Sequence, residues 1–301
     1  MRNFTSTTSH FNLSILAFLF LFLSSCYEKK EACLDIRATN LDLDGDIACE
    51  DCCEYPKLKF EFKNRAISPT DTSIIGFSGM VFDYTQDSFY LDVNDAPFRI
   101  KSIQYYVSNI RLIATDGTEA QINEEIDIQQ VAGIETYKDD FLRINARSSS
   151  TLSAGSFSTI NTYDGVKFSI GMDTEINSAL PANMPTGHVL AVGTDSTLYD
   201  FENSQYLMGN IEIYKDTMEI DSFFNEIPIP LAGNGPLEVQ LLFPESVILP
   251  EGFHFKITLL INCPAWFSTA DITLDSLQIA EKIVSEMSNS ISLLEVTVEH
   301  D

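Results

Sequence analysis

The chain has 301 residues, 45% of them hydrophobic and 11% aromatic, with 44 acidic and 18 basic residues and a formal net charge of −26. That apolar content is enough to bury a core, so the composition indicates a globular chain of one or two domains. A nucleic-acid partner is excluded, because binding to phosphate needs clustered Lys and Arg.

The first 25 residues have the order of a secretory signal peptide. Arg2 precedes an apolar run over residues 13–23, and the small residues Ser24 and Ser25 follow it. The run is too short to cross roughly 30 Å of hydrocarbon as a permanent span, so we expect it to be a signal peptide that is removed. Leu-Ser-Ser-Cys at residues 23–26 resembles the lipobox of bacterial lipoproteins, which predicts a lipid on Cys26. The alternative is an ordinary signal peptide whose first mature residue is cysteine.

A lipidated Cys26 would hold the mature chain to a membrane without any other insertion, since each buried methylene contributes about 0.8 kcal/mol. Tyr27 stands where an Asp retains many lipoproteins at the inner membrane. The sequence therefore favours a location at the outer membrane, on its periplasmic side or on the cell surface. A periplasmic or surface protein is a possible partner there.

Residues 26–56 have little apolar periodicity and are predicted to form a lipidated tether with a loop rich in Cys and Asp. In an oxidising compartment disulfides are the default for the cysteines that follow Cys26, and their odd number leaves one over. Cys52 and Cys53 are adjacent, so they can reach different partners, one of which is Cys263. A thiolate metal site is the competing interpretation, which oxidation disfavours. The disulfide candidates are Cys33, Cys49, Cys52, Cys53 and Cys263.

Within this tether, residues 40–51 have the spacing of a twelve-residue calcium loop. Gly45 stands at position six, where such a loop turns sharply, and hard oxygen ligands are what Ca²⁺ prefers. Asn at the first position and Asp at the last depart from the usual pattern, and an acidic loop that is merely solvated is the alternative. The predicted calcium ligands are Asn40, Asp42, Asp44, Asp46 and Asp51.

From residue 57 onward, alternating or β-branched and aromatic runs predict strands, separated by Gly, Pro, Asn and Asp turns such as Asp116-Gly117. Helical periodicity appears mainly over residues 274–287, where Leu274, Leu277, Ile279, Ile283 and Met287 fall roughly on one face. The predicted fold is all-β: an antiparallel β-sandwich with long loops and a short C-terminal helix, forming a domain over residues 57–301. Residues 138–162 and 172–208 are predicted to be long connections, which often carry binding sites. The predicted strands cover residues 57–62, 74–90, 98–114, 165–171, 210–214, 237–243, 253–261 and 293–298.

Catalytic motifs do not emerge from the sequence. There is no His-x-x-x-His zinc motif, no Gly-x-Ser-x-Gly nucleophile elbow and no phosphate-cradling glycine loop, so we do not expect an enzyme. His254 falls in a predicted strand and His300 is terminal, which leaves His188 as the best candidate metal ligand. The single tryptophan, Trp266, is expected in the core.

One strand motif resembles a known family. Tyr-Tyr-Val-Ser-Asn-Ile-Arg-Leu at residues 105–112 is similar to the central strand of the methanobactin-operon copper-binding protein family, in its lipoprotein branch. Residues 52–58, 168–177 and 265–267 support the resemblance, which spans about residues 57–298.

The resemblance implies a β-rich envelope protein that binds copper, in some members through a tryptophan modified by a di-haem partner enzyme. The family's Trp-rich stretch should fall near residues 190–208, but this chain has no Trp there. The copper ligands expected here are therefore His188 with Met184 or Met208, since imidazole and thioether groups suit copper.

Two functions follow as hypotheses. The first is an envelope-anchored metal-binding module, with copper as the metal. The alternative is a non-catalytic surface module that binds glycan or protein, which requires exposed aromatic rings drawn from Tyr199, Phe201 and Tyr206.

Overall fold

The computed structural model of the chain describes residues 28–49, 51–65, 90–130, 133–147, 150–157, 161–193, 196–215, 226–232 and 235–300. Cys26, the predicted signal peptide and all but the end of the strand predicted over residues 74–90 lie outside these residues. The chain divides into two compact units: unit 1 comprises Met1–Asp35 and Leu41–Cys53, and unit 2 comprises Ile36–Asn40 and Glu54–Asp301. In the part of the chain that is described, no helix is long and apolar enough to cross a membrane.

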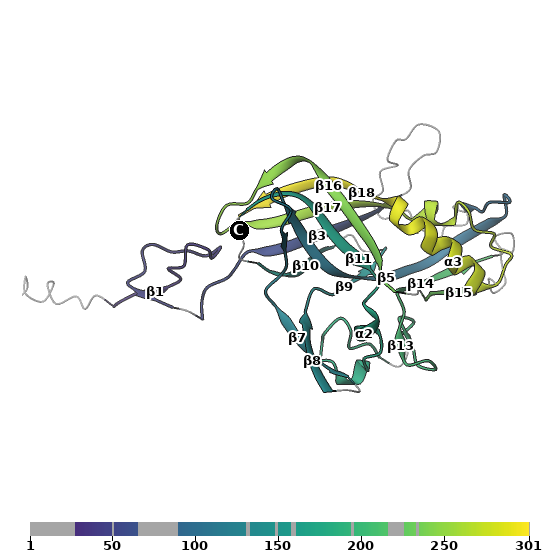
Figure 1. The fold of residues 1–301 in the computed structure, drawn as a ribbon, viewed down its shortest axis with the longest axis horizontal. Helices are drawn as coiled ribbons and strands as arrows, with labels where there is room; N and C mark the ends of the chain where they lie inside the picture. The colour runs from purple at the N-terminus through teal and green to yellow at the C-terminus, as the bar shows by residue number, and fades with distance from the viewer. Residues whose placement is uncertain are drawn as a thin grey trace, which may run out of the picture. The chain divides into compact units, whose positions relative to one another are not determined.

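Unit 2 is built mainly from two sheets (Figure 1). The strands of the larger sheet are β4 (Tyr90–Leu91), β5 (Pro97–Ala114), β6 (Glu119–Ala120), β9 (Leu142–Asn145), β11 (Thr162–Ile170), β14 (Gly209–Tyr214), β15 (Glu226–Leu231) and β16 (Leu237–Ile248). Those of the smaller sheet are β3 (Lys57–Arg65), β10 (Thr151–Ser156), β17 (His254–Asn262) and β18 (Ile291–Glu299). The larger sheet has the order β15-β14-β5-β11-β16 with β4, β6 and β9 paired to β5, and the smaller has the order β10-β3-β17-β18. Within both sheets, the described pairs are antiparallel except β3 with β17, which is parallel.

The main core lies between these sheets. In β3 the predicted alternation is realised, because Leu58, Phe60 and Phe62 are buried while the residues between them are partly exposed. Phe60 meets Phe168 of β11 with ring centroids 6.4 Å apart, and Phe62 meets Tyr105 of β5 at 6.5 Å. These contacts join one sheet to the other, so the predicted β-sandwich is confirmed.

A C-terminal helix covers one end of the larger sheet. Helix α3 (Ser276–Met287) packs on β15 and on the 3-10 turn η3 (Cys263–Phe267) (Figure 1). The Asp275 side chain accepts a hydrogen bond from the backbone N–H of Gln278 at 2.9 Å and thereby caps the first turn.

The helix corrects part of the predicted apolar face. Ile279, Ile283 and Met287 are buried, but Leu274 is 37% exposed and Leu277 is 61% exposed. Because the chain becomes helical only after Asp275, Leu274 stays outside the helix and Leu277 faces solvent. The prediction for Trp266 of η3 is confirmed: it is fully buried, and its indole N–H donates to the Ser290 hydroxyl.

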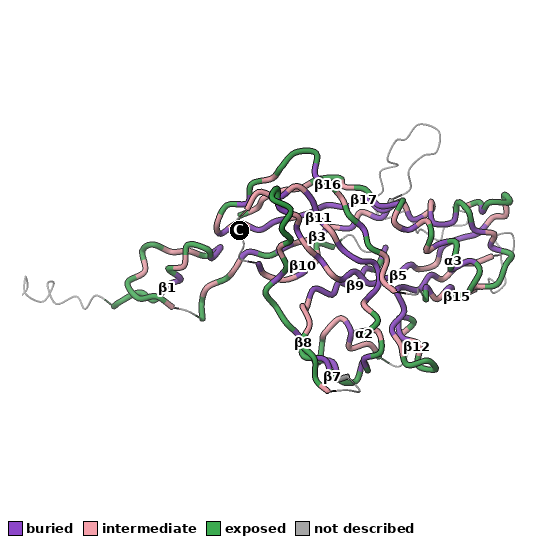
Figure 2. The backbone as a smooth tube through the Cα atoms, viewed as in Figure 1, coloured by how far each residue is buried: buried purple, intermediate pink, exposed green. Residues whose placement is uncertain are grey.

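A second, smaller core lies on the other side of β5. It is covered by the hairpin of β7 (Glu125–Gln130) and β8 (Gly133–Lys138), by α2 (Thr174–Asn177), and by the short pair β12 (Tyr199–Asp200) and β13 (Gln205–Tyr206). Its members include Tyr106, Ile128, Leu190 and Tyr206, and Figure 2 shows the buried stretches of this lobe beside those of the sandwich.

The two predicted long connections are more structured than expected. Residues 138–162 contain β9 and β10, and residues 172–208 contain α2, the 3-10 turn η2 (Pro181–Asn183) and the β12–β13 pair. The periodicity also missed β7, β8 and β15. Strand β15 contains Pro228 and Pro230, which remove backbone donors and place this strand at the sheet edge, where prolines are tolerated.

Unit 1 is small and is stabilised by a disulfide and by local hydrogen bonds. The two-residue strands β1 (Glu31–Ala32) and β2 (Ile47–Ala48) pair in parallel, and a disulfide joins Cys33 to Cys53. Lys30 fixes the acidic loop, because its ammonium group contacts the Asp42 carboxylate at 2.6 Å and its backbone N–H donates to Asp46 at 2.9 Å.

The second core generates a stability prediction. The buried Tyr206 hydroxyl donates to the Leu190 carbonyl at 2.6 Å, so Tyr206→Phe leaves that carbonyl without this donor and should lower the free energy of unfolding by about 1–2 kcal/mol. Tyr137→Phe is the matched control, because the Tyr137 hydroxyl bonds to Glu135 at the surface and its loss should cost less than about 0.5 kcal/mol. Denaturant unfolding measures both, and equal effects would contradict the assignment.

Candidate functional site

The motif at residues 105–112 lies in the middle of β5 and contacts both cores. Successive side chains of a strand point to opposite faces, so Tyr105 and Tyr106 enter different cores. Tyr105 packs in the main core against the ring of Trp266 at a centroid distance of 5.7 Å. Tyr106 packs in the second core against Tyr206 at 6.0 Å. The tyrosine pair therefore fixes the strand between the sandwich and the smaller lobe.

Next to these tyrosines the strand contains an irregularity. Asn109 has a φ of 53°, in the left-handed region, and the pairing of β5 with β11 shifts register between Lys167 and Ser169. Asparagine is one of the few residues that adopts this conformation readily, since its short side chain can bond locally. The Ser-Asn step of the motif is thus a β-bulge that turns backbone N–H groups out of the ladder.

Asp140 satisfies those N–H groups. Its buried carboxylate accepts a hydrogen bond from the backbone N–H of Ile110 at 2.6 Å and from that of Asn109 at 3.1 Å. Burial, the largest influence, raises the pKa of Asp140 to about 6, although the two backbone donors act in the opposite direction.

The bulge also holds the segment that follows β11. The Ser108 hydroxyl donates to the Gly171 carbonyl at 2.7 Å, and the Asn109 amide donates to the Asp173 carboxylate at 3.0 Å. The Gly171 N–H in turn donates to the Tyr106 carbonyl at 2.9 Å. Gly171 has a φ of 93°, which favours glycine, so the chain turns sharply here into α2.

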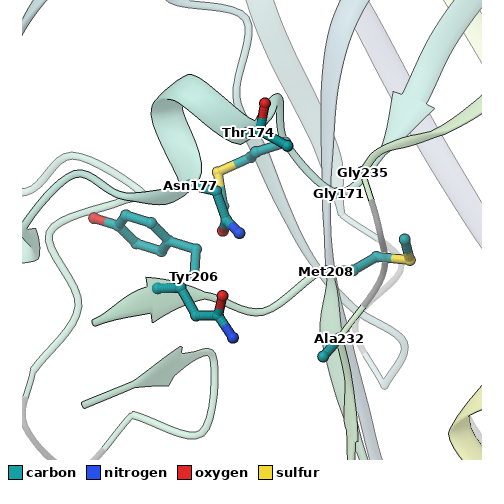
Figure 3. A pocket seen from close by; sticks show the side chains of 9 residues that line it. Gly171, Thr174, Asn177, Tyr206, Met208, Ala232 and Gly235 are labelled. Carbon is teal, nitrogen blue, oxygen red and sulfur yellow. The ribbon is translucent and has the colours of Figure 1, made fainter. Parts of the chain in front are cut away.

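A small cavity opens at this turn (Figure 3). Its volume is about 30 Å³, close to the volume that one water molecule occupies in the liquid. In Figure 3, Tyr206, Asn177 and Thr174 border one side, and Met208 and Ala232 the other. The lining residues are Gly171, Met172, Thr174, Asn177, Gln205, Tyr206, Met208, Ala232 and Gly235.

The structure places the three predicted copper ligands in different surroundings. Both ring nitrogens of His188 are engaged, since Nε2 lies 2.8 Å from the Asp139 carboxylate and Nδ1 accepts from the Leu190 N–H at 3.2 Å. Met184 belongs to the second core, whereas Met208 belongs to the main core and lines the cavity. Of the three predicted residues, the structure places only Met208 at the cavity.

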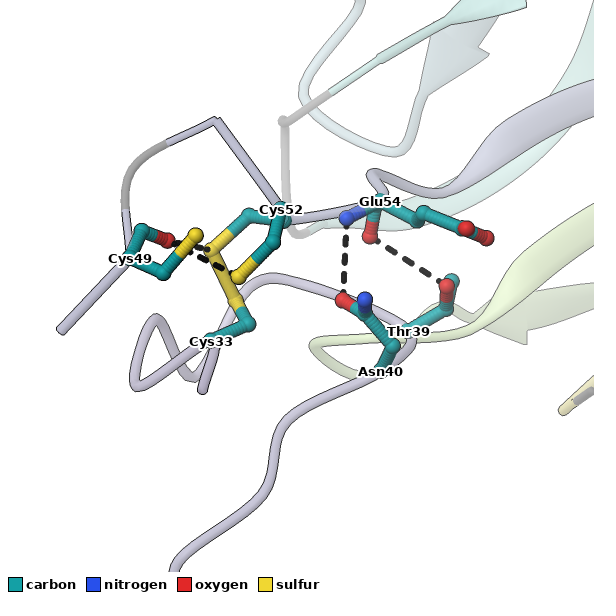
Figure 4. Close-up of a disulfide and its surroundings, with 7 residues drawn as sticks. Cys33, Thr39, Asn40, Cys49, Cys52 and Glu54 are labelled. Atoms are coloured by element: carbon teal, nitrogen blue, oxygen red, sulfur yellow. Dashed lines mark hydrogen bonds between the residues drawn. A yellow bond between two sulfur atoms is a disulfide. The ribbon is translucent and has the colours of Figure 1, made fainter. Parts of the chain in front are cut away.

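The predicted calcium residues are distributed over both units of the chain. Asn40 belongs to unit 2, where its side-chain oxygen accepts from the Glu54 N–H at 2.9 Å (Figure 4). Asp42, Asp44, Asp46 and Asp51 belong to unit 1, and Lys30 contacts two of them. Across the described ranges, no group of three or more His, Cys, Asp or Glu side chains is arranged to hold a metal ion. The calcium loop stays a prediction.

The cysteines pair partly as expected. Cys33 and Cys53 form a disulfide, and Cys49 and Cys52 lie beside it as thiols (Figure 4). The suggested link from Cys52 or Cys53 to Cys263 is wrong for this structure, because Cys53 bonds Cys33 and Cys263 is a fully buried thiol next to Asn64. Its apolar surroundings raise the pKa of the Cys263 thiol.

The aromatic patch required by the glycan- or protein-binding alternative is largely absent. Tyr199 and Tyr206 are buried, and of the three named rings only Phe201 is exposed, at 47%. Tyr199 and Tyr206 pack against each other with ring centroids 4.9 Å apart, because they face one another across the β12–β13 pair.

Most of the residues that line the cavity were not predicted from the sequence. Met172, Thr174 and Asn177 fall in the quoted family segment over residues 168–177, and that segment was the available signal. Asp139 and Asp140 carried no such signal, because a carboxylate that caps a bulge from another strand leaves no local pattern in the sequence.

The buried carboxylate of Asp140 generates a pH prediction. In the folded chain Asp140 keeps its proton up to a pH of about 6, whereas in the unfolded chain it loses the proton near its ordinary pKa of 3.8. The contribution of Asp140 to the free energy of unfolding should therefore fall as the pH rises between these values. Asp140→Asn removes this titration, so the stability difference between native chain and variant should be larger at pH 4 than at pH 7. Denaturant unfolding at a series of pH values measures it, with the surface variant Asp127→Asn as control. A difference that does not change with pH would contradict the raised pKa.

Comparison with known proteins places these features in a family. The MbnP family model matches residues 56–276. Among solved structures, MbnP from Methylosinus trichosporium is similar over 71% of this chain and 78% of that chain, at 12% sequence identity and a TM-score of 0.38. None of the curated proteins matches. The family model covers most of the chain, including the bulge, the cavity turn and both cores, and the chain therefore belongs to the MbnP family.

Proposed function

We propose that this protein is an exported, lipid-anchored binding module for copper, and that it is not an enzyme. The observation that carries the proposal is the small cavity beside the β5 bulge, which combines the size of a single ion with sulfur-bearing side chains. Membership of the MbnP family supports copper as the cargo.

The size of the cavity restricts what it can hold. Sites for organic ligands usually enclose about 300–1,000 Å³, whereas this cavity measures about 30 Å³. A monatomic ion or a water molecule fits such a space, and a sugar or peptide side chain does not. This cavity therefore suits an ion and not a glycan.

The donor groups suit a soft ion. Met172 and Met208 are both buried and both line the cavity. Thioether sulfur favours Cu(I) over hard cations such as Ca²⁺ and Mg²⁺. Asn177, Gln205 and Thr174 also line the cavity and have neutral side-chain oxygen atoms that can serve as further ligands.

The frame around the cavity is fixed by short hydrogen bonds. Ser108 and Asn109 hold Gly171 and Asp173, and Met208 is bonded through its backbone to Tyr106 and Leu231. A Cβ atom at Gly171 would lie 3.2 Å from Met208 Cγ, so the methionine is closely packed over the glycine. Binding groups held by packed strands lose little freedom when they capture an ion.

The lipid anchor and the location at the outer membrane are part of the same proposal. The signal-like segment, the lipobox-like residues 23–26 and the absence of an Asp after Cys26 support a lipid-anchored chain at the outer membrane. An exported protein meets copper ions in the envelope before they reach the cytoplasm, which gives a copper-binding module a use there.

The copper proposal predicts which methionines matter. Met172→Leu and Met208→Leu keep the volume but remove sulfur, so each should weaken Cu(I) binding by about tenfold or more. Titration of the purified chain with Cu(I) against a competing chelator measures the affinity. Met287→Leu is the matched control, because Met287 is equally buried but lies on α3.

His188 provides a second comparison: His188→Gln should leave Cu(I) affinity nearly unchanged, because both of its ring nitrogens are already engaged. No binding by the native chain above buffer controls would overturn the copper proposal, and a loss confined to His188→Gln would move the site away from the cavity.

The anchor is tested separately. Cys26→Ser should abolish incorporation of labelled palmitate and release the protein from the membrane fraction, since the lipidated thiol is gone. Cys49→Ser serves as the control and should retain both label and membrane association. Unchanged labelling of Cys26→Ser would contradict the lipoprotein assignment.

A further inference from the structure

We propose that Cys49 and Cys52 form a second binding site, a dithiol that takes a soft monovalent cation, with Cu(I) as the ion that fits best. The site lies in unit 1 and is distinct from the methionine cavity of unit 2. It does not depend on the proposed function of that cavity, because each site is built from its own side chains.

The Cys49 carbonyl group lies next to the disulfide and to the Cys52 side chain (Figure 4). The Cys52 thiol donates to the Cys49 carbonyl oxygen with a sulfur–oxygen distance of 3.3 Å, and the disulfide sulfur of Cys53 lies 3.4 Å from the same oxygen. The disulfide takes Cys33 and Cys53 and leaves Cys49 and Cys52 as thiols next to it.

The two thiols are close enough to share an ion. Their spacing, Cys-x-x-Cys, is short, and the Cys52 thiol donates to the carbonyl oxygen of Cys49 itself, so the two residues lie together in one turn. Two thiolates that bind one metal ion at about 2.3 Å each lie about 4 Å apart. Because the Cys52 thiol already lies 3.3 Å from the Cys49 carbonyl oxygen, rotation of the two side chains is enough to bring both sulfur atoms onto one ion.

A hydrogen bond and the disulfide already fix the backbone on both sides of the two thiols. The Cys49 N–H donates to the Ala32 carbonyl at 3.0 Å, directly after the paired strands β1 and β2. On the other side, Cys52 is bonded in sequence to Cys53, which the disulfide fixes to Cys33. Ordered ligands of this kind bind with a smaller entropic cost.

The number of ligands selects the ion. Zinc sites use four ligands, or three with an open position. Within the residues described, no third His, Cys, Asp or Glu side chain joins this pair as a metal-binding group. Cu(I) is soft and thiophilic and is stable with two thiolates. Binding exchanges two thiol protons for one Cu(I), which leaves the oxidation states of copper and sulfur unchanged.

The charge around the pair favours a cation. Glu31 is close enough to Cys52 to act on it electrostatically, and the whole chain has a formal net charge of −26. Cys52 is exposed and Cys49 is partly exposed, so an ion can reach both from solvent.

The test uses the full chain, purified anaerobically and not treated with a reductant that would open the disulfide. A thiol reagent should first find Cys49 and Cys52 reactive, since Cys263 is buried. Titration with Cu(I) should then give a sulfur-to-copper charge-transfer absorption, and the Cys49→Ser/Cys52→Ser double variant should lose this absorption together with one equivalent of bound Cu(I). Asp51→Asn, beside the pair, is the control and should retain both.

Two results would overturn the inference. One is the absence of reactive thiols in unit 1, which would show that Cys49 and Cys52 are joined as a second disulfide. The other is an unchanged copper stoichiometry and absorption in the double variant. Failure of the methionine cavity is recognised separately, because Met172→Leu and Met208→Leu leave the thiolate absorption in place while the cysteine variants remove it.

Discussion

The hydrogen bonds between the Asp140 carboxylate and the backbone of the β5 bulge are the constraint on which the rest of unit 2 depends. A bulge in a central strand leaves N–H groups without ladder partners, and a buried N–H without a partner is costly. Asp140 comes from the chain that follows the β7–β8 hairpin, so satisfying these donors also attaches the hairpin to β5. Asp139, its neighbour, contacts His188 and thereby draws in the loop before β12.

Just before the bulge, β5 contacts a different core on each of its two faces. On one face Tyr105 completes the aromatic contacts of the sandwich, and on the other Tyr106 starts the second core. The cavity lies where the chain leaves β11 and passes Met208, at the junction between the two cores. A site at such a junction inherits the rigidity of both packed regions, whereas a site at a loop tip depends on the loop alone.

The sequence was sufficient to predict the all-β class, most of the strands in the sandwich and helix α3, because alternation and β-branched composition indicate half-buried strands and a 3.6-residue period indicates a helix. It was not sufficient for β7, β8 and β15. The prolines of β15 obscure an edge strand, and the exposed β8 shows no buried alternation. For the site, the family segment pointed to Met172 and Asn177, but His188 was chosen on residue type alone. Only the structure shows that Asp139 and the Leu190 N–H engage its ring nitrogens.

The disulfide between Cys33 and Cys53 has a mechanical consequence. It links residues 20 positions apart, a stretch whose extended contour is about 70 Å. Tension applied at the N-terminal end of the chain passes from Cys33 along two covalent paths: through the sulfur bridge to Cys53 and on to β3, and along the backbone to residues 36–40, which belong to unit 2. The bridge therefore shares the load between two paths, and reducing it would leave the short backbone segment between Cys33 and residue 36 to carry the whole load.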